Sequence, residues 1–174
     1  MNNLRKLVYT ALAAMIIAPA AISTALAQRA KEPTIVEIAI DNAAFSTLVS
    51  AVVKADLVST LDGRRQFTVF APTNDAFDAA AEALLGDGFT GEDLVAELDA
   101  DTLAGILLYH VVPGNRNSNS VLPAKQIRTV NGGFLKVDGI TLVGNLTSAN
   151  LVVDLADIPA RNGTIHVIDF VLLP

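Results

Sequence analysis

The clearest pattern of apolar and polar positions lies in residues 67–77, which read FTVFAPTNDAF. Apolar residues recur at every second position before the proline, and this period predicts a strand with one face more buried than the other. The alternating positions are Phe67, Val69 and Ala71 on one face and Thr68 and Phe70 on the other. Pro72 has no N–H group to donate, so we predict that the strand ends there.

A helix is predicted directly after this strand. Thr73, Asn74 and Asp75 are residue types whose side-chain oxygens accept hydrogen bonds from the free N–H groups at a helix N-terminus. The apolar positions that follow recur at helical spacing and are Phe77, Ala80, Ala81 and Leu84. A buried strand that turns through a capped corner into a helix must be packed on both sides, so we expect the core to form around residues 67–77.

The rest of the chain changes character near its middle. Helical spacing of apolar residues predicts helices within 35–39, 45–53, 94–98 and 103–110. After a polar loop at 115–120, short apolar runs are separated by Asn-Gly and Asp-Gly turn signals. These runs predict strands at 126–130, 134–137, 140–143, 151–155 and 164–172. A helical first half and a strand-rich second half predict an α+β domain whose strands pack against helices.

The N-terminus has the three parts of a secretory signal peptide. Residues 5–6 are basic, residues 7–18 are mostly apolar, and residues 25–27 form an Ala-Leu-Ala cleavage site. The alternative is a transmembrane anchor, but a proline and a Ser-Thr pair within the apolar run weaken that interpretation. We therefore predict a signal peptide at 1–27, a flexible lead at 28–33 and one domain at 34–174. The chain is then exported to the periplasm or the extracellular space, without membrane insertion after cleavage.

Charge narrows the classes of partner. Removal of Arg5 and Lys6 with the leader leaves 10 basic residues against 18 acidic ones, a net charge of −8. We find no basic cluster in the sequence, and the pair Arg64–Arg65 is too small to form a binding patch. An acidic domain of this kind is a poor partner for nucleic acid. The chain has no cysteine, so its core holds the fold without disulfides.

Few residues have the chemistry that catalysis or metal binding requires. The two histidines, His110 and His166, lie in apolar runs without metal-ligand spacing, and no nucleophile elbow or phosphate loop occurs. His110 extends an apolar helix stripe, which favours a hydrogen-bonded core histidine over a metal ligand. The acidic residues of 92–101 suit the first turns of helices better than a calcium loop. Asp169 is expected to form a structural hydrogen bond with a neighbouring loop, and a poised catalytic acid is the alternative.

Four stretches together resemble the fasciclin-like domain family. They are the helical segment 34–61, FTVFAPTNDAF at 67–77, LLYHVVPG at 107–114, and ADIPARNGTIHVIDFVLLP at 156–174. The resemblance covers essentially the whole predicted mature chain in order and spacing. It implies a wedge of mostly antiparallel strands packed against N-terminal helices. The matched boxes supply a structural motif that comprises Phe67, Val69, Phe70, Pro72, Thr73, Asn74, Asp75, Phe77, Asn162, Gly163, His166 and Asp169.

The resemblance also implies candidate binding residues. In animal matrix members of the family, integrin recognition has been assigned to an Asp-Ile pair and to a Tyr-His motif. These fall on Asp157 and Ile158, and on Tyr109 and His110. Pro159 follows the Asp-Ile pair here and departs from the animal sequences, so we do not infer integrin binding.

The family consists of extracellular, periplasmic or cell-surface modules for adhesion and interaction that are not known as enzymes. We therefore expect a secreted or periplasmic module that binds a cell-surface or matrix protein or a polysaccharide, without catalysis, cofactor or metal. The alternative is a carrier of a small molecule or lipid, with the ligand between the β-wedge and the helices. A hydrolase that uses Asp169 or His110 is the third hypothesis.

Overall fold

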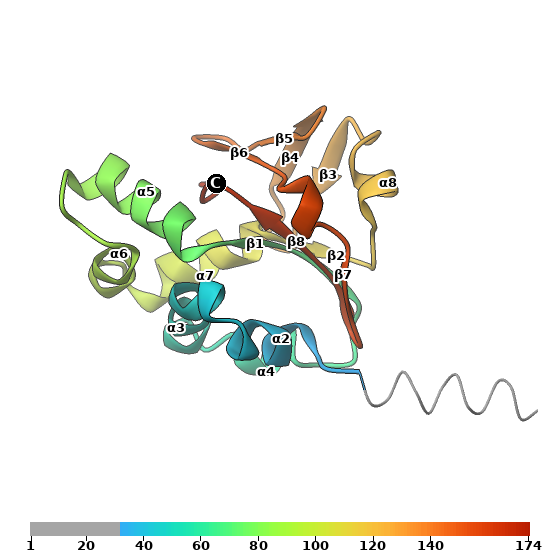
Figure 1. Ribbon diagram of the computed structural model, residues 1–174, viewed down its shortest axis with the longest axis horizontal. Coiled ribbons are helices and arrows are strands. Elements are labelled where there is room, and N and C mark those ends of the chain that lie inside the picture. Colours follow the sequence, from blue (N-terminus) through green and yellow to red (C-terminus); the bar gives the residue numbers. More distant parts are fainter. Residues whose placement is uncertain (1–31) are drawn as a thin grey trace, which may run out of the picture. The chain divides into compact units, whose positions relative to one another are not determined.

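The computed structural model describes residues 32–174, and the predicted signal peptide at 1–27 lies outside them. The described part has an α+β fold, as predicted. The helices between residues 35 and 109 gather on one side, a sheet of four short strands lies on the other, and β1 and β8 run between the two layers (Figure 1). Among residues 32–174 no single helix is long and apolar enough to cross a membrane; Ile35–Asp41 and Ala43–Lys54 pass that test only as a pair bent by 106°.

The helices lie mostly in the first half of the chain. They are α2 (Ile35–Asp41), the 3-10 helix η1 (Ala43–Phe45), α3 (Ser46–Lys54), α4 (Val58–Leu61), α5 (Asn74–Leu85), α6 (Gly91–Glu97), α7 (Ala100–Tyr109), α8 (Ser118–Val121) and the 3-10 helix η2 (Val153–Leu155). The strands are β1 (Phe67–Pro72), β2 (Val111–Pro113), β3 (Gln126–Arg128), β4 (Phe134–Asp138), β5 (Thr141–Val143), β6 (Ser148–Asn150), β7 (Ile158–Ala160) and β8 (Gly163–Ile168).

Two four-stranded sheets organise these elements. Sheet A has the strand order β2-β1-β8-β7, and sheet B has the order β3-β4-β5-β6. All pairs are antiparallel except the central pair of sheet A, in which β1 and β8 run parallel from Phe67 opposite Gly163 to Pro72 opposite Ile168. The predicted wedge of mostly antiparallel strands is therefore confirmed, with a parallel pair at its centre.

Strand β1 is buried on both faces, and the prediction of one less buried face is wrong. All six of its residues are buried. Val69 and its face belong to the core that the helices cover, whereas Phe70 belongs to a second core between sheet A and sheet B. The sequence pattern misled because two covering layers bury both sets of alternating positions.

The corner after β1 forms as predicted, but Thr73 and Asn74 cap two different helices. Thr73 caps α5, and its hydroxyl accepts a hydrogen bond from the Ala76 N–H at 3.3 Å. Asn74 does not cap its own helix. Its side-chain oxygen accepts from the Thr47 N–H at 3.1 Å, and its amide donates to the Ala43 carbonyl at 2.9 Å. Asn74 thus caps the neighbouring helix α3, whose own N-cap residue makes no side-chain cap bond.

Several predicted boundaries in the second half are wrong. The strand predicted at 151–155 is a single bridge at Leu151 followed by η2, and the strand predicted at 164–172 ends at Ile168. The polar loop at 115–120 contains the start of α8. Three strands of three residues, β2, β6 and β7, are not predicted by the sequence pattern, and β2 and β7 also include a proline.

Asn162 and Gly163 hold the turn from β7 to β8 against two other parts of the chain. The Asn162 side chain is buried; it accepts from the Ile35 N–H at 2.9 Å and donates to the Leu61 carbonyl at 2.6 Å. Gly163 lies so close to β1 that an added Cβ would be 1.8 Å from the Phe67 carbonyl oxygen. The first pair of the central parallel ladder therefore requires glycine at this position.

We predict that Gly163→Ala lowers the free energy of unfolding by more than about 3 kcal/mol, because the backbones of β1 and β8 must separate to admit the methyl group. Chemical denaturation of the purified chain measures this change. Gly105→Ala is the matched control, because Gly105 lies inside α7 with no neighbouring atom within 4 Å of an added Cβ. The control should raise stability by about 0.5–1 kcal/mol. Equal effects of the two substitutions would contradict the prediction.

Candidate functional site: the loop junction at Asp157

Tyr109 is an interior side chain that joins α7 to sheet B. It is 0% exposed, and its hydroxyl donates to the Phe134 carbonyl at 2.8 Å. A Cβ added at Gly133 or Gly144 would lie 2.6 Å or 3.2 Å from the ring, so two glycines make room for it. Burial raises the pKa of Tyr109 above its ordinary value. The side chain therefore contributes no surface to a partner in this fold.

His110 is a hydrogen-bonded core histidine, as predicted. It is 2% exposed, its Nε2 accepts from the Leu172 N–H at 2.9 Å, and its Nδ1 lies 2.8 Å from the Ile106 carbonyl. Because Nε2 is the acceptor, Nδ1 carries the proton and the ring is neutral. Burial lowers the pKa of His110 to about 4. Both ring nitrogens are used by the fold, which leaves neither for a metal.

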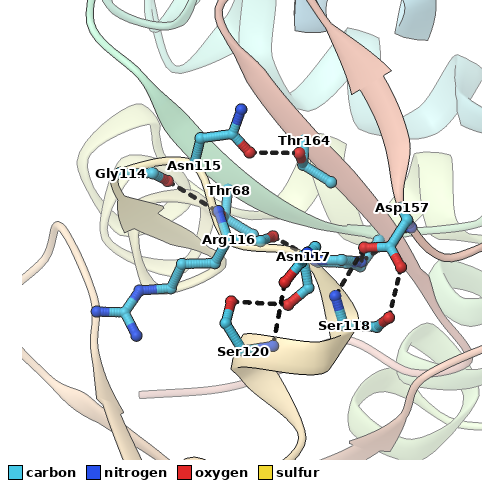
Figure 2. Close-up of polar contacts among 10 residues, drawn as sticks. Thr68, Gly114, Asn115, Arg116, Asn117, Ser118, Ser120, Asp157 and Thr164 are labelled. Atoms are coloured by element: carbon cyan, nitrogen blue, oxygen red, sulfur yellow. Dashed lines mark hydrogen bonds and ion pairs between the residues drawn. The ribbon is translucent and has the colours of Figure 1, made fainter.

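Asp157 ties the start of β7 to the start of α8 (Figure 2). One carboxylate oxygen accepts from the Ser118 N–H at 2.7 Å, and the other accepts from the Ser118 hydroxyl. The residue has φ of +62°, a conformation that few residues other than glycine adopt. Partial burial alone would raise the pKa of Asp157, but the hydrogen bonds from Ser118 and the nearby His166 lower it below its ordinary value.

His166 connects the segment of Asp157 with the loop of Arg116. It is 0% exposed, its Nδ1 accepts from the Asp157 N–H at 3.1 Å, and its Nε2 donates to the Arg116 carbonyl at 2.9 Å. The ring also stacks on Phe70, with centroids 5.7 Å apart. Burial lowers the pKa of His166, although Arg116 and Asp157 oppose that shift. The neutral ring therefore fixes the positions of Arg116 and Asp157 relative to each other.

The loop that carries Arg116 is held from β1 and β8 as well. The hydroxyl of buried Thr68 donates to the Gly114 carbonyl and accepts from the Arg116 N–H, each at 2.8 Å. Thr164 donates to the Asn115 side chain at 2.6 Å. Figure 2 shows these contacts side by side, with the Arg116 guanidinium extended away from Asp157. The loop surface at Asp157 is thus preorganised by side chains from β1, β8 and α8.

The remaining candidates have structural contacts. Ile158 is half-buried and packs against the helix-side core. Asp169 lies just after β8, and its carboxylate accepts from the Asn150 N–H at 2.6 Å and the Asn150 amide at 2.9 Å, which confirms the predicted hydrogen bond to a neighbouring segment. Asp93 and Asp99 bond to the first turns of α6 and α7, and these backbone and side-chain hydrogen bonds lower the pKa of each. Within residues 32–174, no group of three His, Asp or Glu side chains could hold a metal.

Sequence reasoning missed Thr68, Arg116 and Ser118 as parts of this junction. Asn117 was the available signal, because its side chain caps α8 by accepting from the Ser120 N–H at 3.1 Å. The sequence pattern predicts a polar loop at 115–120, whereas Asn117 caps the start of the short helix α8 there. The contact from Ser118 to Asp157 spans 39 residues, and no local pattern predicts it.

Comparison with known proteins decides the family. The Fasciclin domain family model matches residues 43–174. The chain belongs to the fasciclin domain family. Its relatives include protein sll1483 of Synechocystis, which is 43% identical over 144 residues. The aligned region covers 81% of this chain and 73% of that protein.

Other relatives of this fasciclin domain come from cell surfaces and from animals. The cell surface glycolipoprotein MPB83 of Mycobacterium bovis is 34% identical over 139 residues, 77% of this chain and 57% of that protein. Human periostin is 35% identical over 136 residues, 75% of this chain and 15% of periostin. The FAS1 domain pair of the insect cell adhesion molecule Fasciclin I has the same fold, with a TM-score of 0.67 at 16% identity over 82% of this chain and 51% of that one.

We predict that Asp157→Ala and Ser118→Ala each lower the free energy of unfolding by about 1 kcal/mol, because the carboxylate is partly exposed and its hydrogen bonds compete with water. The double variant should lose less than the sum of the two, since both substitutions remove the bond between the Ser118 hydroxyl and the carboxylate, whereas only Asp157→Ala also removes the bond from the Ser118 N–H. Denaturant titrations measure all three. Asp154→Ala is the control, because this exposed carboxylate in η2 makes no hydrogen bond to the described chain. Additive losses would show that the two side chains act independently.

We predict that stability falls as the pH drops from about 6.5 to about 4, by about 3 kcal/mol from His110 alone. The pKa of His110 is lowered in the folded state, so the unfolded chain binds more protons in this window. His110→Ala should flatten this dependence and lower the free energy of unfolding at pH 7 by about 1–3 kcal/mol. Thermal or denaturant unfolding at several pH values checks both. A variant of wild-type stability that loses a partner would instead assign His110 a binding role.

Proposed function

We propose that this fasciclin domain is an exported, non-catalytic adhesion module that binds a cell-surface or matrix protein or polysaccharide. Membership of the family supports the coarse assignment to adhesion and interaction, and the relatives include a cell surface glycolipoprotein and a cell adhesion molecule. The signal-peptide pattern at 1–27 supports export. The main support for the proposal is the loop junction at Asp157. It exposes polar surface, while the Asp157 carboxylate and the His166 ring are engaged in hydrogen bonds within the fold.

The contacts of the titratable candidates support a role without catalysis. His110, His166 and Asp169 each use their polar atoms to bond backbone groups of other segments. Among the described residues, every buried side-chain nitrogen and oxygen has a hydrogen-bond partner. A general base or nucleophile needs a proton or lone pair that is available to a substrate. Side chains whose polar atoms hold loops together are better suited to shaping a binding surface than to catalysis.

One observation favours the carrier as a second candidate. An apolar cavity lies between the helices and sheet A, where the carrier hypothesis places its ligand, and its mouth exposes Ile40 and Val53, each 61% exposed. Its volume is about 50 Å³, whereas pockets for drug-sized ligands have about 300–1,000 Å³. A lipid would therefore enter only if α2 and α3 moved apart. Saturable binding of a fluorescent fatty acid that Val49→Trp abolishes would establish the carrier, because Val49 lines the cavity.

We predict that a strain without this gene attaches less well to surfaces and matrix than the parent strain, because the module no longer links the cell to its partner. Quantitative attachment of parent, deletion and complemented strains measures this effect. Capture from envelope and matrix fractions on the purified chain should retain a specific partner that an unrelated acidic protein of similar size does not. Unchanged attachment together with no specific partner would overturn the proposed function.

A further inference from the structure

The outer face of sheet B gathers basic and aromatic side chains that the sequence alone did not bring together. Arg128 lies directly opposite Phe134 in the pairing of β3 with β4, and Lys136 lies opposite Gln126. Side chains alternate along a strand, so Phe134 and Lys136 project to the same side of β4. Ile127 and Leu135, between them in sequence, are buried in the core beneath the sheet. These four residues, Gln126, Arg128, Phe134 and Lys136, form what we call the sheet B face.

The sheet B face is open and its charges are unpaired. Phe134 is 48% exposed, and the other three residues are exposed as well. Within residues 32–174, neither Arg128 nor Lys136 forms an ion pair or a side-chain hydrogen bond, and the Phe134 ring makes no stacking or cation contact. Asp138, at the end of β4, projects to the same side as Phe134 and Lys136, but it forms no ion pair with Lys136. In an acidic domain, this face can offer two cations around an aromatic ring to an external partner.

We propose that the sheet B face binds an acidic polysaccharide, a glycan that carries carboxylate or sulfate groups. An exposed aromatic ring packs against the apolar face of a sugar ring, and this contact positions the sugar on the sheet. The guanidinium of Arg128 can form two parallel hydrogen bonds with a carboxylate or sulfate, and the Lys136 ammonium adds a point charge. Gln126 can donate to and accept from sugar hydroxyls. This inference rests on the proposed function and names the chemistry of one of its partner classes.

Charge complementarity favours a polysaccharide over an anionic membrane or a nucleic acid. The predicted mature chain carries a net charge of −8, so a broad anionic surface or a densely charged duplex would be repelled by most of the domain. A polysaccharide chain is narrow enough to contact this one face. The three-residue and five-residue strands of the pair β3–β4 present a short platform that suits a few sugar units.

The direct test is binding of the purified chain to immobilised alginate and dextran sulfate, which supply carboxylate and sulfate separately, with neutral dextran as reference. The wild-type chain should bind at least one acidic glycan and should be released as salt rises from about 50 mM to about 500 mM. Arg128→Gln with Lys136→Gln should weaken binding about tenfold, the size expected for two exposed ion pairs. Arg128→Lys with Lys136→Arg should retain most of the binding.

Two matched controls separate this face from general charge and hydrophobicity. Arg64→Gln with Arg65→Gln removes the same charge from the exposed loop before β1 and should leave binding unchanged. Phe134→Leu should weaken binding while Phe134→Tyr retains it, and Phe89→Leu, at another exposed phenylalanine, should have no effect. Equal loss from the Arg64–Arg65 variant would overturn the proposal. No preference for the acidic glycans over neutral dextran, or binding to phosphatidylglycerol vesicles in their place, would also overturn it.

Failure of this inference can be told apart from failure of the proposed function. The Arg128→Gln, Lys136→Gln variant is introduced into the deletion strain, and thermal unfolding of the purified variant confirms its fold. If deletion reduces attachment and this variant restores it fully, the sheet B face is not the binding surface and the adhesion module stands. If deletion leaves attachment unchanged and no partner is captured, the proposed function itself is wrong.

Discussion

The parallel pairing of β1 with β8 is the contact on which the other parts of the domain depend. It joins residues 67–72 to residues 163–168, so the first signature stretch of the chain lies beside the last. Both strands are buried at every position, because helices cover one face of sheet A and sheet B covers the other. The close approach at Gly163 and the bonds of Asn162 fix the end of this pair. The loops of the candidate site are continuations of β2 and β7, the strands that flank this central pair.

Structural features that depend on local sequence pattern were predicted correctly. The strand from Phe67, the cap at Thr73 and the helix after it were found from alternation, cap chemistry and helical spacing. The core position of His110 followed from the apolar stripe that it extends. Prediction failed where three-dimensional neighbours decide the outcome. Asn74 was assigned to the cap of its own helix, because the free N–H groups of α3 lie 27 residues away in sequence.

The candidate site shows the same limit more strongly. Asp157 and Ile158 were located through family resemblance, yet their contacts with Ser118 and the helix-side core are properties of the fold. The sequence showed no basic cluster, because Arg128 and Lys136 are separated by a turn, by Phe134 and by buried Leu135. Only the register of β3 with β4 brings them to one face. Charge patches of this kind arise when strand pairing brings together residues that are several positions apart in sequence.

The long separation between β1 and β8 has a consequence for how the chain folds. The centre of sheet A cannot close until residues 163–168 are available, near the end of a chain of 174 residues. Such non-local pairing makes folding slow, because a loop of about 90 residues must be ordered before the contact forms. The order of strands along the chain thus keeps sheet A open until β8, its last strand in sequence, can pair with β1.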